Sequence, residues 1–210
     1  MDNQQPPPFG KNTKYSVDMQ LLLKLLKDPL YARQLDNYKD TKYGWIGLAV
    51  SIVGFFISGL LMSWQFGKNV NIILSFMMNS GSILNGYSGG IMAARILLLG
   101  VMSNLSLFIS IWLISLWKGG RRRTMKALIT RLGAMQYITG AGMIVAGIFA
   151  IISMKFALAI IIIILLYTLI VTMIGAMELY EVAEENKSVF LISVFAAYGI
   201  LLATFMQFIM

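Results

Sequence analysis

Five long apolar runs dominate this chain, separated by polar segments. They cover approximately residues 44–66, 93–117, 133–153, 156–178 and 188–210. A helix needs about 20 residues to cross roughly 30 Å of hydrocarbon, so each run is long enough to span a membrane. Trp45, Trp64 and Trp117 lie at the ends of runs, where indole rings favour the membrane–water interface. The pattern predicts five membrane-spanning helices.

The segment before the first run has an amphipathic pattern. Five apolar residues share one face at helical spacing: Val17, Leu21, Leu22, Leu25 and Leu26. Ser16 is a candidate N-cap, and Pro29 should end the helix near Asp28. The segment is too short and too charged to span, so we expect a helix on the membrane surface. The predicted fold is all-α, with an N-terminal tail and amphipathic helix in 1–43 and a five-helix membrane bundle in 44–210.

Residues 67–92 fit neither pattern. The apolar stretch NIILSFMM is followed by a segment rich in Asn, Ser and Gly. We expect an outer loop with a short interfacial helix. A re-entrant hairpin is the alternative, and it would have to be shielded by protein.

The composition agrees with a membrane protein and removes several kinds of chemistry. The chain is 58% hydrophobic and contains neither cysteine nor histidine. Soluble domains are less apolar and carry more charge. Disulfides, thiol nucleophiles, Ser-His-Asp triads and histidine metal ligands are therefore excluded. We expect no enzymatic activity, no cofactor and no metal.

The basic residues predict how the chain crosses the membrane. All but three of the 17 lysines and arginines fall in 1–43, 118–132 and 179–187. The exceptions are Lys68, Arg95 and Lys155. Basic loops stay in the cytoplasm, so we expect a cytoplasmic N-terminus and a C-terminus at the outer face.

Six of these cations form a cluster between the second and third runs: Lys118, Arg121, Arg122, Arg123, Lys126 and Arg131. The simplest role is a topology anchor. Clusters of this size beside a span also attract anionic lipids, so we expect such lipids as partners. The cluster has no interleaved aromatic residues and no recognisable motif, so nucleic acid is not expected.

Polar residues inside the runs are few. Coupled transporters place ionisable groups within the bundle, whereas the nine carboxylates here lie outside the runs or at their ends. Asn104 and Gln136 are expected to join helices, with a substrate contact as the alternative. Arg95 is expected to reach the outer interface, with an anion or lipid-phosphate contact as the alternative.

Small residues mark one face of the third run. Gly133, Gly140 and Gly147 repeat every seven residues. Such spacing allows another helix to approach closely. The partner helix belongs either to the same chain or to a second copy in a homo-oligomer.

Four segments give the chain a resemblance to the Yip superfamily, the membrane proteins named for interaction with Ypt/Rab GTPases, and most to its prokaryotic members. They are LLKLLKDPLYARQL, TKYGWIGLAV, MKALITRLGAMQYITGAGMI and IGAMELYEVAEENKSVFLISVF. The resemblance covers roughly residues 20–210. It implies a five-helix bundle with a cytoplasmic N-terminus, and in eukaryotic members a role in vesicle traffic and membrane shaping. The chain departs from the family pattern in its long segment 67–92.

These observations lead to a functional expectation. We expect a non-enzymatic multi-pass protein of the bacterial plasma membrane that organises the membrane or partner proteins. A membrane-protein partner or a homo-oligomer is expected alongside lipid. The alternatives are a permease-like or export-accessory component, or a self-protection protein against a membrane-active peptide.

Overall fold

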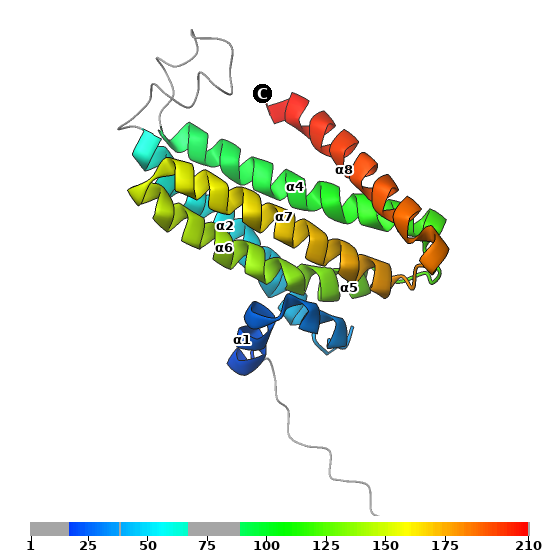
Figure 1. Cartoon of the computed structure of the whole chain (residues 1–210). Helices are drawn as coiled ribbons and strands as arrows, with labels where there is room; N and C mark the ends of the chain where they lie inside the picture. The colour runs from blue at the N-terminus through cyan, green and yellow to red at the C-terminus, as the bar shows by residue number, and fades with distance from the viewer. Residues whose placement is uncertain (1–16, 38, 67–88, 210) are drawn as a thin grey trace, which may run out of the picture.

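A computed structural model describes residues 17–37, 39–66 and 89–209, and every element in them is helical (Figure 1). In chain order they are α1 (Met19–Lys27), η1 (Pro29–Gln34), α2 (Thr41–Phe66), α4 (Gly89–Lys118), α5 (Met125–Leu128), η3 (Ile129–Gly133), α6 (Ala134–Ile152), α7 (Met154–Leu179), η4 (Glu184–Asn186) and α8 (Lys187–Ile209). Five helices are long and apolar enough to cross a membrane, with α5, η3 and α6 forming one of them. The predicted all-α fold with five such helices is confirmed.

The second predicted run begins earlier than expected. Helix α4 starts at Gly89, four residues before the predicted position. Most of the predicted outer loop, residues 67–88, lies outside the described residues.

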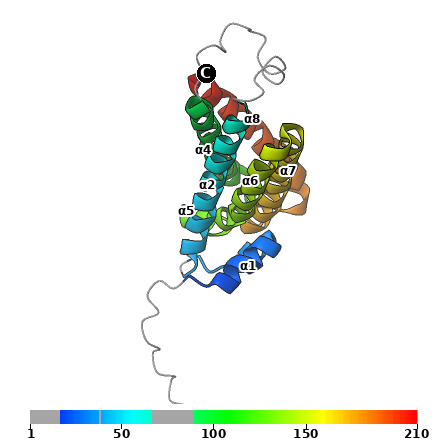
Figure 2. The same ribbon diagram turned by 90° about the vertical axis from the view of Figure 1, so that its left-hand side faces the viewer.

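Helices α2, α4, α6 and α7 form the body of the bundle, and α8 lies at its edge (Figures 1 and 2). Helix α8 runs along α4 and makes few contacts with α7. In its most apolar stretch only 11% of α8 is buried, against 44% for α2 and for the span made by α5, η3 and α6. The third predicted span and α2 are therefore the most buried of the five spans, to an equal extent.

The tightest packing in the bundle is between α2 and the span made by α5, η3 and α6. A Cβ atom on Gly47 would lie 2.1 Å from the carbonyl oxygen of Gly133, and one on Gly54 would lie 2.4 Å from that of Gly140. Seven residues further along the span, a Cβ atom on Gly147 would lie 3.0 Å from the Cα of Ser58. The structure thus places the three glycines of the seven-residue repeat against α2 of the same chain.

The third span begins before its predicted start. Helix α5 starts at Met125, so the expectation that 118–132 is a loop is wrong for its second half. Thr124 is the N-cap, and its Oγ1 accepts a hydrogen bond from the N–H of Ala127 (3.3 Å). Burial of Ala127 and Leu128 then stabilises this first turn despite the charges beside it.

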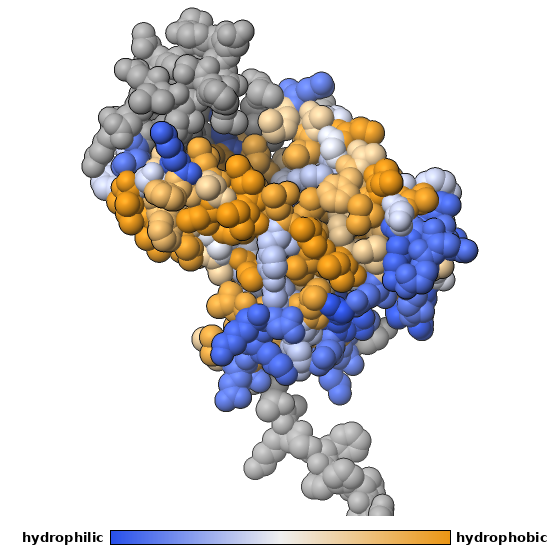
Figure 3. Space-filling view, in the orientation of Figure 1, coloured by the Kyte–Doolittle hydropathy of each residue, from blue (hydrophilic) through white to orange (hydrophobic). Residues whose placement is uncertain are grey.

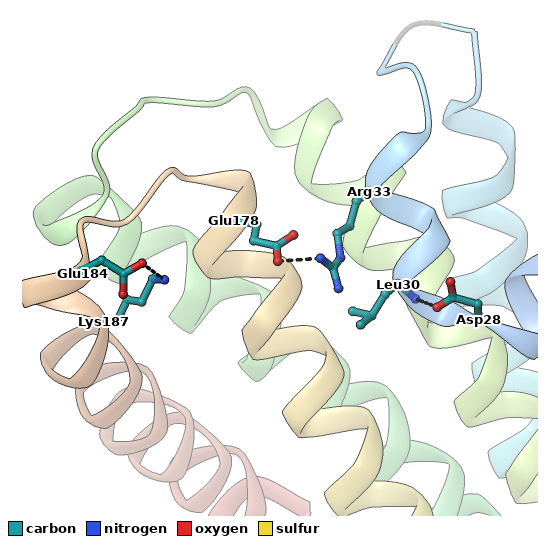
Figure 4. Close-up of polar contacts among 6 residues, drawn as sticks. All are labelled: Asp28, Leu30, Arg33, Glu178, Glu184 and Lys187. Carbon is teal, nitrogen blue, oxygen red and sulfur yellow. Dashed lines mark hydrogen bonds and ion pairs between the residues drawn. The ribbon is translucent and has the colours of Figure 1, made fainter.

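Helices α1 and η1 lie across one end of the bundle (Figures 1 and 2). Asp18 caps α1 by accepting from the N–H of Gln20 (2.9 Å), whereas the predicted cap Ser16 lies outside the described residues. Asp28 ends α1 and caps η1 (Figure 4). Leu22 and Leu25 are buried in the same core as residues of α6 and α7. Part of the apolar face expected to rest on the membrane therefore packs on the bundle.

Candidate functional site

Hydrophilic residues gather at the end of the bundle where α1 and η1 lie, here called the α1 end (Figure 3). Helices α4 and α7 finish at this end, and α2, α5 and α8 begin there. Among the described lysines and arginines, only Arg95 and Lys155 belong to the opposite end. The fold thus brings to one end of the bundle basic residues that are far apart in the sequence.

The linker between α4 and α5 is docked on the C-terminal end of α7. The backbone N–H of Arg121 donates to the carbonyl of Tyr180 (3.0 Å), and Nε of Arg123 donates to that of Leu179 (3.2 Å). The last carbonyls of a helix lack intrahelical partners and carry partial negative charge, so cations are favourable there. Gly120 permits the approach, since a Cβ would lie 2.3 Å from the carbonyl oxygen of Glu181.

Glu181 is the counter-charge of this linker. Its Oε1 accepts from Nη1 of Arg121 (3.2 Å) and from Nη2 of Arg123 (2.9 Å). Its backbone has φ of 50°, a left-handed conformation that is uncommon for a residue with a side chain. One carboxylate serves two guanidinium groups, while the exposed Arg122 between them makes no polar contact with the described residues. The cluster therefore keeps a surplus of positive charge.

Another ion pair ties the N-terminal helices to the bundle. Nη1 of Arg33 in η1 donates to Oε1 of Glu178 at the end of α7 (2.6 Å; Figure 4). Glu184 pairs with Lys187 at the start of α8 (Figure 4). Exposed pairs contribute little, about 0–1 kcal/mol each. The Arg33 pair therefore orients η1 more than it stabilises the fold.

The remaining cations of the predicted cluster lie in different environments. Nζ of Lys118 lies 4.7 Å from the centre of the exposed Trp117 ring. Lys126 is exposed on α5. Arg131 is half-buried, and its Nε has no hydrogen-bond partner among the described residues. Arg95 is half-buried near the opposite end of α4 and takes no part in the α1 end.

A second group of polar side chains lies inside the bundle. Nδ2 of Asn104 in α4 donates to Oγ of Ser51 in α2 (3.3 Å) and to the carbonyl of Gly100 (2.9 Å). The hydroxyls of Ser103 in α4 and Tyr198 in α8 share a hydrogen bond of 2.8 Å. The Ser103 pair is a direct polar link between α8 and the body of the bundle.

Gln136 is at the centre of the polar contact between α6 and α7. Its Nε2 donates to Oγ1 of Thr172 (3.4 Å), and its Oε1 accepts from Oγ1 of Thr139 (2.9 Å). Thr139 also bonds to Thr168 (2.9 Å). Asn104 and Gln136 were predicted as polar contacts inside the bundle, whereas Tyr198, Thr168 and Ser51 were not. Hydroxyls in helices commonly bond to their own backbone, so no sequence pattern reveals these pairings.

A cavity of about 120 Å³ lies among these contacts. Its polar lining consists of Ser103, Asn104, Gln136, Thr139, Thr168 and Tyr198, called here the polar layer. Its apolar lining comes largely from leucines of α7. The cavity thus combines hydrogen-bonding groups with an apolar wall, as ligand sites do.

The molecule therefore offers two places for polar chemistry, the α1 end with its surplus of positive charge and the uncharged polar layer. The first can hold anions, and the second can hydrogen-bond neutral groups. Comparisons of the chain with protein-family models, with curated proteins and with solved structures found no match.

Proposed function

We propose that this protein is a non-enzymatic component of the plasma membrane that binds anionic lipid at its α1 end and so organises lipids and partner proteins at the cytoplasmic face. The observation that carries the proposal is the state of the three linker arginines. Arg121 and Arg123 are held by Glu181 and by the end of α7, whereas Arg122 is exposed. Arg122 is therefore the cation best placed to meet a lipid phosphate.

The neighbourhood of Arg122 supports a location at headgroup depth. Helix α4 ends in Trp117 and Lys118, with the indole ring 67% exposed and the ammonium group over it. Exposed tryptophan next to a cation at the end of an apolar helix is typical of the interface between hydrocarbon and headgroups. The linker that follows would then lie among the lipid phosphates.

The resemblance to the Yip superfamily agrees with this proposal, since it implies a cytoplasmic N-terminus and a role in membrane organisation. The partner would be a membrane protein or a second copy of this chain. Helix η1 is paired through Arg33 with Glu178 at the end of α7, on which the linker is docked, and Met19 and Leu23 of the neighbouring α1 are exposed. A partner docked there would be brought next to the bound lipid.

The test is lipid retention after reconstitution into nanodiscs of phosphatidylcholine and phosphatidylglycerol. Native mass spectrometry then counts the phosphatidylglycerol molecules that stay bound. We expect Arg122→Gln to weaken retention about fivefold, because one cation near an anionic surface contributes about 1 kcal/mol. The matched control is Lys155→Gln, which removes an exposed cation from the opposite end and should leave retention unchanged.

Added salt separates this outcome from a folding defect. About 0.5 M salt should lower wild-type retention toward that of Arg122→Gln, because salt weakens the attraction between exposed cations and anionic headgroups. Equal retention in wild type and Arg122→Gln would refute the lipid role of the linker. An equal loss of retention in Arg122→Gln and Lys155→Gln would refute the assignment of the lipid site to the α1 end.

A further inference from the structure

We infer that the cavity at the polar layer binds the uncharged, hydrogen-bonding head of a neutral lipid, which enters sideways from the bilayer between α7 and α8. Four features of the cavity support this: its depth, its unused hydrogen-bonding capacity, its lack of charge and its opening.

The polar layer lies at the middle of the bundle. Four of the five spanning helices contribute to it a hydroxyl or amide within three residues of their own midpoint, and Ser51 of α2, which accepts from Asn104, lies as close to the midpoint of its helix. These residues are Ser51, Asn104, Thr139, Thr168 and Tyr198. With a rise of 1.5 Å per residue, all lie within about 5 Å of mid-depth. A molecule bound there would be surrounded by hydrocarbon rather than by headgroups.

The layer has hydrogen-bonding capacity that its own contacts leave unused. Ser103 and Tyr198 carry two hydroxyl protons between them, and their shared bond uses one. Asn104 donates its amide hydrogens to Ser51 and Gly100. Its Oδ1 accepts no hydrogen bond from the described residues. A spare donor and a spare acceptor therefore line one cavity. Polar groups in hydrocarbon are costly unless paired, so a partner with a hydroxyl and a carbonyl is favoured.

Charge and size restrict the class of ligand. The lining residues that the structure describes include none with a charge. A phosphate or ammonium head would be buried there without a counter-charge, at high cost. The volume of about 120 Å³ is also smaller than the roughly 300–1,000 Å³ of sites for drug-sized ligands. The cavity suits a small neutral head whose chains remain outside it.

The side of the cavity toward α7 and α8 gives those chains a path. Leu165 and Leu166 of α7 line the cavity and are 37% and 55% exposed. Tyr198 of α8 lines it as well and is half-buried. Helix α8 runs along α4 rather than α7, as Figure 1 shows. The acyl chains of a bound lipid can therefore lie in the bilayer against α7 while its head reaches the polar layer.

The experiment uses two photoreactive probes in phosphatidylcholine vesicles that contain the full-length protein. One is dioleoylglycerol with a diazirine in one acyl chain, which has a neutral head with a hydroxyl and ester carbonyls. The other is phosphatidylcholine with the same photoreactive chain, which reports contact with any lipid-facing surface. We expect dioleoylglycerol to label α7 and α8 beside the cavity more strongly than phosphatidylcholine does, and unlabelled dioleoylglycerol to compete.

Matched double variants locate the interaction. Ser103→Ala with Tyr198→Phe removes both hydroxyls of the shared bond and should lower dioleoylglycerol labelling about fivefold, the factor for one hydrogen bond of about 1 kcal/mol. Ser110→Ala with Thr204→Val also removes one hydroxyl from α4 and one from α8. Those hydroxyls donate to carbonyls of their own helices, so labelling should persist.

The competition in the wild-type protein needs no variant and keeps the inference falsifiable if a double variant fails to fold. Equal labelling by the two probes, or no competition, would mean that water satisfies the polar layer and would overturn the proposal. Equal loss of labelling in both double variants would also overturn it, since the effect would not come from the cavity.

Discussion

At the scale of single residues, two tyrosines near the α1 end are both buried but differ in their hydrogen bonds. Oη of Tyr43 accepts from the backbone N–H of Asp18 (3.0 Å). Oη of Tyr180 has no partner among the described residues. The nearby Ser115 hydroxyl donates to the carbonyl of Trp112 instead (2.7 Å). One phenol thus anchors the start of α1, and the other is a buried hydroxyl that contributes no bond.

Removing these two hydroxyls should have different effects on the free energy of unfolding. Tyr43→Phe leaves the Asp18 N–H without its partner and should lower the free energy of unfolding by about 1 kcal/mol. Tyr180→Phe should leave it unchanged or raise it, because an unpaired buried hydroxyl is replaced by hydrogen. Thermal unfolding of detergent-solubilised protein measures both. A lower midpoint for Tyr180→Phe than for Tyr43→Phe would contradict this assignment.

The difference in stability between the wild type and Tyr180→Phe also depends on pH, in a direction that the pKa of Tyr180 sets. Burial raises the pKa of Tyr180, because its charged form would lose solvation. The unfolded chain then ionises first, so the contribution of Tyr180 is intact below about pH 10 and is lost as the pH rises through its folded-state pKa. Tyr180→Phe should therefore lose less stability than the wild type as the pH rises above about 10.

At the scale of elements, the contact between α2 and α6 is the closest in the bundle and is built from backbone. Gly47 and Gly54 of α2 are seven residues apart, as are Gly133 and Gly140 of the facing span. A seven-residue repeat keeps one face of each helix toward its partner along a left-handed crossing. Without side chains between them, the helices gain dispersion contacts along the seam.

An added methyl group should therefore have a strong effect at the seam and little effect elsewhere. Gly47→Ala places Cβ against the Gly133 carbonyl and should destabilise the protein by about 1–3 kcal/mol, the usual cost of overpacking. Gly199→Ala in α8 is the control, because no atom lies within 4 Å of its added Cβ. It should be neutral or slightly stabilising, since alanine favours helix. Thermal unfolding of both variants tests the seam, and equal midpoints would disprove it.

At the scale of the whole molecule, charge and span number together predict orientation. The α1 end holds most of the described cations, and among the described residues the first span begins at this end while the fifth finishes at the opposite one. By the positive-inside rule the α1 end should face the cytoplasm.

The chain contains no cysteine, so single introduced cysteines can report the orientation without background. With a membrane-impermeant maleimide, Lys155→Cys should react in intact cells. Arg122→Cys should react only after permeabilisation, because it lies at the α1 end. Both positions are exposed, so differences in burial do not confound the comparison. The reverse pattern would place the N-terminus outside.

Much of the architecture could be predicted because hydrophobic runs and charge are local properties of the sequence. The five spanning helices and the end of α1 before Pro29 are of this kind. Pairings between distant segments could not be predicted, since nothing local marks Gly47 as the partner of Gly133 or Glu181 as the counter-charge of Arg121. The start of the third span at Met125 was not predicted, because the cations there obscured the buried face behind them.

The parallel pairing of α2 with α6 has a consequence for biosynthesis. Gly47 and its partner Gly133 are far apart in the sequence, so the first span enters the membrane well before the third exists. At about 5–20 residues per second, the delay is on the order of ten seconds. During that time the bare glycine face of α2 has only lipid or the insertion machinery beside it. The nascent protein is therefore most vulnerable to wrong partners before its third span is made.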